Sequence, residues 1–128
     1  MSQAPHALLI SADLFFGSKV TGTAAAIGLK AELAGSVTQG LEKLAGGGYR
    51  CVILDLAMPG LSPGDVVDAV RSLDEEERPR VIAFGSHVHT ALLAAARAAG
   101  CDEVMPRSRF SAELVQILKQ YCGEGEDS

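Results

Sequence analysis

Asp55 is the residue in this sequence that is best placed to do chemistry. It follows the apolar run Cys51–Leu54, and a Met58-Pro59-Gly60 turn comes shortly after it. A continuous apolar run of this length is typical of a strand buried on both faces, as in the middle of a parallel sheet. Open α/β sheets place their ligands at the carboxyl ends of the strands, and a carboxylate buried there needs partners. Asp55 is therefore the first functional candidate.

Apolar runs and helical patterns alternate along the chain and predict the elements that would hold Asp55. Strands are expected at residues 7–10, 29–33, 51–54, 81–84 and 101–105. Helices are expected at residues 14–27, 38–44, 63–73, 90–99 and 112–121, the last one capped by Ser111 and with a core face of Leu114, Val115 and Leu118. This alternation predicts an α/β fold, a doubly wound parallel five-stranded sheet with helices on both faces. For five βα units the flavodoxin-like strand order 2-1-3-4-5 is expected.

Length and composition limit the class of protein. A chain of 128 residues predicts one domain, at residues 1–122, followed by an acidic, glycine-rich flexible tail at 123–128. A net charge of −5 argues against a nucleic-acid-binding surface. No apolar run approaches the roughly 20 residues of a membrane span, and no signal peptide is recognisable, so a cytoplasmic location is expected. The three cysteines, Cys51, Cys101 and Cys122, lack zinc-site spacing and are expected to be reduced and without a role.

The segment around Asp55 resembles the phosphoacceptor strand and loop of response-regulator receiver domains (CheY-like). The similarity continues through residues 81–86, through residues 94–107 and into the start of the last helix at 111–114, and so covers nearly the whole chain. The resemblance implies the flavodoxin-like receiver fold and transfer of a phosphoryl group to Asp55 with the help of Mg²⁺. It also implies protein partners, a histidine kinase or a downstream signalling protein, that bind at the predicted helices 90–99 and 112–121 and the strand between them.

Compared position by position, this chain is an atypical member of that family. The family's metal-binding acidic pair, its phosphoryl-binding hydroxyl, its lysine and its aromatic switch correspond here to Ser11 and Ala12, to Gly85, to Arg107 and to Val104. Asp13 follows the positions of the acidic pair, so Asp13 and Asp55 are the candidates for a weak magnesium site. Ser86 lies beside the position of the hydroxyl, so Ser86 and Arg107 are the candidates for contacts to the phosphoryl group.

Each candidate has a structural alternative. Asp13 is well placed to cap the helix that follows it. Asp55 could form a buried ion pair with Arg107, left over from a phosphorylation site. Ser86 could be a turn residue or a helix cap.

Three functions follow from these residues. The leading hypothesis is a two-component signalling module, not an enzyme, that acts through protein–protein interaction with impaired or absent phosphorylation. The alternative is a working single-domain response regulator, phosphorylated at Asp55 with Mg²⁺. The third is a small-molecule-binding α/β domain whose pocket would lie at the same edge of the sheet, lined by Ser11, Asp13, Ser86 and Arg107.

Overall fold

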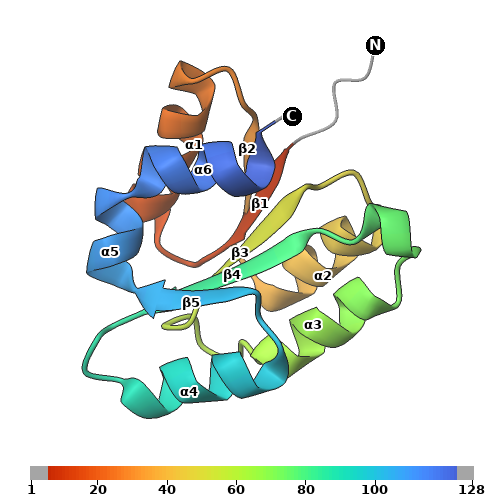
Figure 1. The fold of residues 1–128 in the computed structure, drawn as a ribbon, viewed down its shortest axis with the longest axis vertical. Helices are drawn as coiled ribbons and strands as arrows, with labels where there is room; N and C mark the ends of the chain where they lie inside the picture. Colours follow the sequence, from red (N-terminus) through yellow and green to blue (C-terminus); the bar gives the residue numbers. More distant parts are fainter. Residues whose placement is uncertain (1–5, 124–128) are drawn as a thin grey trace.

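Five parallel strands form the centre of the molecule in the computed structural model, which describes residues 6–123 (Figure 1). The strands are β1 (Ala7–Ile10), β2 (Ala31–Ala34), β3 (Cys51–Asp55), β4 (Arg80–Gly85) and β5 (Glu103–Pro106). Their order in the sheet is β2-β1-β3-β4-β5. The prediction of a five-stranded parallel sheet with the order 2-1-3-4-5 is therefore confirmed. The predicted acidic tail lies, apart from Gly123, outside the described residues.

Helices cover both faces of this sheet. They are α1 (Leu14–Ala26), α2 (Val37–Ala45), α3 (Pro63–Arg71), the short 3₁₀ helix η1 (Glu75–Glu77), α4 (Thr90–Ala99), α5 (Arg107–Ala112) and α6 (Leu114–Cys122). Figure 1 shows α1, α5 and α6 on one side of the sheet and α2, α3 and α4 on the other. Each layer of helices encloses its own apolar core. None of the helices in residues 6–123 is long and apolar enough to cross a membrane.

The strand β3 is central because both of its neighbours and both of its faces are covered. It pairs with β1 on one side and with β4 on the other, and all five of its residues are buried. Val52 and Leu54 pack into the core beneath α2, α3 and α4, whereas Cys51 and Ile53 pack into the core beneath α1 and α6. This double burial explains why the strand has no alternation of apolar and polar residues.

The last helix differs from its prediction. It is divided at Glu113 into α5 and α6, and Ser111 lies inside α5 and does not cap α6. The Ser111 hydroxyl instead accepts a hydrogen bond of 2.6 Å from the Lys19 ammonium on α1. Ile117 occupies the core position that had been expected for Val115, which is exposed. Leu114, Ile117 and Leu118 follow the ordinary helical spacing of three and four residues on the buried face of α6, so the expectation for Val115 assigned the wrong residue to that face.

Cys51 and Cys122 form a disulfide, which contradicts the expectation that all three cysteines are reduced. Their Cα atoms lie 5.5 Å apart, because β3 and α6 meet on the same face of the sheet. The two residues are separated by 71 positions, so their spacing alone carried no sign of the pairing. Cys101 is the free thiol among the described residues, and burial, together with the nearby Asp102 carboxylate, raises the pKa of this thiol to about 11.

Candidate functional site

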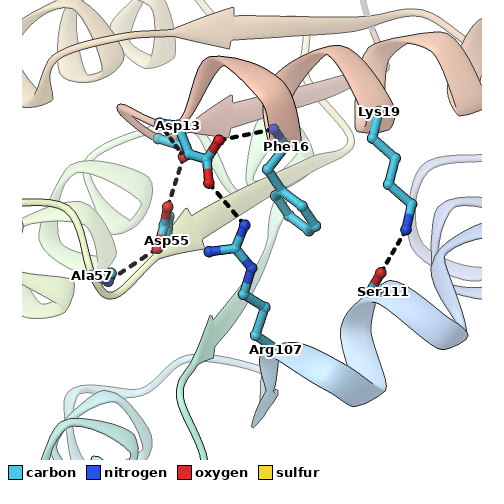
Figure 2. Close-up of polar contacts among 8 residues, drawn as sticks. Asp13, Phe16, Lys19, Asp55, Ala57, Arg107 and Ser111 are labelled. Carbon is cyan, nitrogen blue, oxygen red and sulfur yellow. Dashed lines mark hydrogen bonds and ion pairs between the residues drawn. The ribbon is translucent and has the colours of Figure 1, made fainter.

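The carboxyl ends of the strands bring the predicted site residues to one edge of the sheet. Asp55 ends β3, Ser11 follows β1, Ser86 follows β4, and Arg107 follows β5. Figure 2 shows Asp55 beside the start of α1, with Arg107 reaching toward Asp13 from α5. The strand ends converge as the predicted parallel sheet requires, since all of them point in the same direction.

Both carboxylate oxygens of Asp55 are engaged by the protein itself. Its Oδ2 accepts a hydrogen bond of 2.7 Å from the Ser11 hydroxyl, and its Oδ1 accepts one of 3.0 Å from the Ala57 N–H (Figure 2). Ser11 is fully buried, and Asp55 is only 3% exposed. The Ser11 hydroxyl oxygen also accepts a hydrogen bond from the Asp13 N–H at 3.1 Å. Each oxygen of the buried carboxylate thus has one hydrogen-bond donor from the chain.

The ion pair between Asp55 and Arg107 that was the structural alternative is not formed, because Arg107 binds Asp13. The Arg107 Nη2 lies 2.8 Å from the Asp13 Oδ2. The guanidinium also lies over the ring of Phe16, with its Cζ 4.3 Å from the ring centroid. The Phe16 ring packs against Phe84 and Phe110, so the Arg107 guanidinium lies against a cluster of three aromatic rings. The contact between Arg107 and Phe16 was not predicted from the sequence.

Asp13 also caps α1. Its Oδ1 accepts a hydrogen bond of 2.9 Å from the Phe16 N–H, which is the geometry of an N-cap. The Arg107 guanidinium, and after it the Phe16 N–H, lower the pKa of the Asp13 carboxyl below its ordinary value of 3.8. The structural alternative for Asp13, that it caps the helix that follows it, is therefore confirmed.

Protonation of the Asp13 carboxylate at acidic pH should lower the free energy of unfolding. Because its pKa in the folded chain lies below 3.8, the ionised carboxylate stabilises the fold fully above that pH, and the contribution is lost as the pH falls below it. We expect the wild type to lose more free energy of unfolding between about pH 5 and about pH 2 than Asp13→Asn does. Urea titrations across this range measure the difference, and equal losses in the two proteins would contradict the assignment.

Ser86 does not contact Asp55. Its hydroxyl oxygen accepts a long hydrogen bond of 3.4 Å from the Val88 N–H, within the turn that leads to α4. In residues 6–123 no hydrogen bond connects Ser86 with Asp13, Asp55 or Arg107. Ser86 thus has the turn role that was its structural alternative.

Gly85, which stands where the family has a hydroxyl, has little room for a side chain. A Cβ atom there would lie 3.3 Å from the Leu56 Cβ, 3.4 Å from the Leu56 Cδ1 and 3.6 Å from the Leu93 Cδ2. We expect Gly85→Ser to lower the free energy of unfolding by about 1–2 kcal/mol, since the neighbouring side chains must move aside. Gly64→Ser, at the half-buried start of α3, would be a less crowded comparison, since the nearest atom to a Cβ there is the Ser62 Oγ at 3.7 Å. Equal stability of Gly85→Ser and the wild type would contradict the close packing of Leu56 and Leu93 around position 85.

The side chains at this edge do not fit a magnesium site in the arrangement described. Mg²⁺ in proteins prefers carboxylate and water oxygens in octahedral geometry. Both Asp55 oxygens accept hydrogen bonds from the chain, and Asp13 is paired with a guanidinium. Among residues 6–123 no group of three or more histidine, cysteine, aspartate or glutamate side chains is arranged to hold a metal ion. A cation at Asp13 and Asp55 would have to displace Arg107 first.

Three cavities on the described surface lie away from these residues. Their volumes are about 680, 310 and 260 Å³. None of the three is lined by Asp55, Ser86 or Arg107. The hypothesis of a small-molecule pocket around Asp55 gains no support from them.

Ser11 is the functional residue whose role was missed from the sequence. The register of the sheet pairs Ile10 with Leu54, so the next residues along the two strands, Ser11 and Asp55, lie side by side. The sequence predicted that the two strands run parallel, but the contact between Ser11 and Asp55 follows only when the register of that pairing is known.

Comparison with solved structures places this arrangement among known folds. A response-regulator receiver domain from Bermanella marisrubri has a TM-score of 0.77 at 20% identity, covering 93% of this chain and 98% of the other. The receiver domain of a sensor histidine kinase from Pseudomonas aeruginosa, with a magnesium ion coordinated in its active-site cleft, has a TM-score of 0.77 at 17% identity and covers 94% and 99%.

A third solved structure is the receiver domain of a Saccharomyces cerevisiae response regulator, co-crystallised with a histidine phosphotransfer signaling protein. It has a TM-score of 0.76 at 13% identity and covers 94% of this chain and 92% of the other. No protein-family model and no curated protein matches the sequence. The resemblance noted in the sequence is thus confirmed by structure: the chain has the fold of the CheY-like response-regulator receiver domains.

Proposed function

We propose that this chain is a two-component signalling module that acts by binding other proteins and that ordinary phosphorylation of Asp55 does not control it. The observation that carries this proposal is the hydrogen bonding of Asp55. Its Oδ2 is held by the Ser11 hydroxyl at 2.7 Å and its Oδ1 by the Ala57 N–H at 3.0 Å. The module is a binding protein in this proposal and not an enzyme.

Phosphoryl transfer to a carboxylate needs a free carboxylate oxygen and groups that neutralise the developing charge. Here the Ser11 hydroxyl donates to one Asp55 oxygen and makes it a weaker nucleophile, and Arg107 is paired with Asp13. Loss of a single preorganised donor costs on the order of 10²–10³ in rate, and in this chain several positions differ from the family. A weak Mg²⁺ site at Asp13 and Asp55 stays a prediction, and so do contacts of Ser86 and Arg107 with a phosphoryl group.

Exposed apolar side chains supply the surface for a protein partner. Phe15, in the first turn of α1, is 92% exposed, and Leu14 beside it is exposed as well. Leu92 on α4 and Val115 on α6 are further exposed apolar residues, in the region where the resemblance to receiver domains predicted partner contacts. Large apolar side chains in water are typical of protein interaction sites when they are grouped. We infer that the partner is a histidine kinase or a downstream signalling protein.

The test is an attempt to phosphorylate the protein. The chain is incubated with acetyl phosphate and Mg²⁺, and its intact mass is measured, with a phosphorylatable receiver domain as the positive control for the donor. We expect no phosphoryl adduct. A stoichiometric adduct that Asp55→Asn abolishes would overturn the proposal and establish a working response regulator.

A further inference from the structure

A cavity of about 680 Å³ lies at the amino edge of the sheet, at the other end of β3 and β4 from Asp55. It is formed by the loop that leads into β3, by η1 and its connection to β4, and by the end of α6. Its charged and aromatic lining consists mainly of Arg50, Arg78, Arg80, Glu76, Glu77 and Tyr121. We refer to it as the arginine cavity. It shares no residue with the site around Asp55.

Contacts with the rest of the protein orient the guanidinium groups of the cavity. Arg78 donates from Nε to the Leu73 carbonyl at 3.1 Å and from Nη2 to the carbonyl of Arg71, the last residue of α3, at 2.9 Å. The Arg80 guanidinium lies over the Tyr121 ring, with its Cζ 5.8 Å from the centroid. The main-chain N–H of Arg80 donates to the Arg50 carbonyl at 3.0 Å, so Arg50, just before β3, lies beside the first residue of β4. None of these contacts neutralises the positive charges.

The three arginines have no anionic partner within residues 6–123. The ion pairs in that part of the chain are Lys43–Glu32, Arg107–Asp13 and Arg109–Glu113. Glu76 and Glu77 line the same cavity but form no ion pair with the arginines. Three arginines against two glutamates leave the lining with a net positive charge of one, in a chain whose net charge is −5. Unpaired guanidinium groups that share one cavity attract anions.

We propose that the arginine cavity binds a small polyanion through two or more phosphoryl groups. The planar guanidinium fork matches a phosphate group with two parallel hydrogen bonds. The cavity volume of about 680 Å³ falls in the range of roughly 300–1,000 Å³ that is usual for small-molecule sites. Because the arginines come from two chain segments, linked phosphoryl groups can engage more of them than a single phosphate can. Glu76 and Glu77 oppose this binding and favour ligands with a high charge.

Calorimetric titration with inorganic pyrophosphate tests the proposal, with orthophosphate and sulfate as single-anion comparisons at matched ionic strength. We expect pyrophosphate to bind about tenfold more tightly than either single anion, because it gains at least one more charge-assisted hydrogen bond. A nucleoside diphosphate in parallel shows whether a base adds affinity. Tighter binding would assign a nucleotide as the ligand class, and equal binding would assign the phosphoryl groups alone.

Variants locate the binding. Arg50→Ala combined with Arg80→Ala should weaken pyrophosphate binding about tenfold or more, whereas Arg97→Ala, an exposed arginine on α4, should leave it unchanged. Glu76→Gln with Glu77→Gln should tighten it. Absence of pyrophosphate binding up to the millimolar range, or an equal loss in the Arg97 variant, would overturn the proposal. Circular dichroism confirms that each variant is folded, and Asp55→Asn should bind normally, which separates this site from the proposed signalling function.

Discussion

Ser11→Asp is expected to lower the free energy of unfolding by about 3–4 kcal/mol at neutral pH. Ser11 is fully buried, and its hydroxyl lies 2.7 Å from the Asp55 carboxylate, so the variant would place two carboxylates in contact. Two such groups cannot both ionise at low cost, and the pKa of one of them must rise. A raised pKa in the folded chain means that the variant is relatively more stable at low pH and loses stability as the pH increases.

Magnesium should reverse this loss. The substitution restores one of the two acidic positions of the family beside Asp55, and a pair of carboxylates at strand ends suits a divalent cation. We therefore expect Mg²⁺ to stabilise Ser11→Asp more than it stabilises the wild type, as measured by urea unfolding with and without the ion. Ser11→Asn is the matched control, since it has a similar size without the charge. If Ser11→Asp were as stable as Ser11→Asn, close contact between position 11 and Asp55 would be disproved.

Loss of the Cys51–Cys122 disulfide is the second change with a large expected effect. The bond closes a loop of 71 residues that includes most of the sheet. Cross-links of this kind stabilise a protein by about 2–4 kcal/mol, chiefly by restricting the unfolded chain. We expect Cys51→Ala, Cys122→Ala and the double variant to lose the same amount, since each of them removes the same bond.

Cys101→Ala is the control for this series, because the Cys101 thiol is free and half-buried. Urea titrations of all four variants give the comparison, and thiol counting under denaturing conditions reports the oxidation state directly. Three reactive thiols in freshly purified, unreduced protein would contradict the disulfide. The result also bears on location: a cytoplasmic protein stays a prediction, and disulfides are more usual in oxidising compartments.

The overall fold could be predicted from the sequence because it depends on apolar runs and on the helical spacing of apolar residues, both of which are visible within short segments of the chain. The fully buried strand β3 follows from its apolar run, and the position of Asp55 at its end follows with it. Boundaries were less accurate: β2 begins at Ala31, two residues later than predicted, and the last helix is divided. Local sequence determines whether a strand or a helix forms, whereas contacts with other strands and helices determine where it begins and ends.

The partners of the individual polar groups could not be predicted in the same way. Asp13, Asp55 and Arg107 were all recognised as site residues, but the ion pair considered as an alternative joined Arg107 to Asp55, whereas the structure joins it to Asp13. The alternatives differ by the direction of a long side chain, and the ring of Phe16 beneath the guanidinium favours the direction toward Asp13. Such a choice depends on packing between α1 and α5, which are far apart in the chain.

Residue types and their order were thus enough to identify a doubly wound sheet and the end of the strand that carries Asp55. The packed chain was needed to show that Ser11 holds Asp55, that Arg107 holds Asp13 and that Cys51 is joined to Cys122. The reason is physical. Burial patterns average over many residues, but a hydrogen bond or a disulfide requires two particular atoms to meet within a few ångströms, and only the register of the strands and the packing of the helices bring them there.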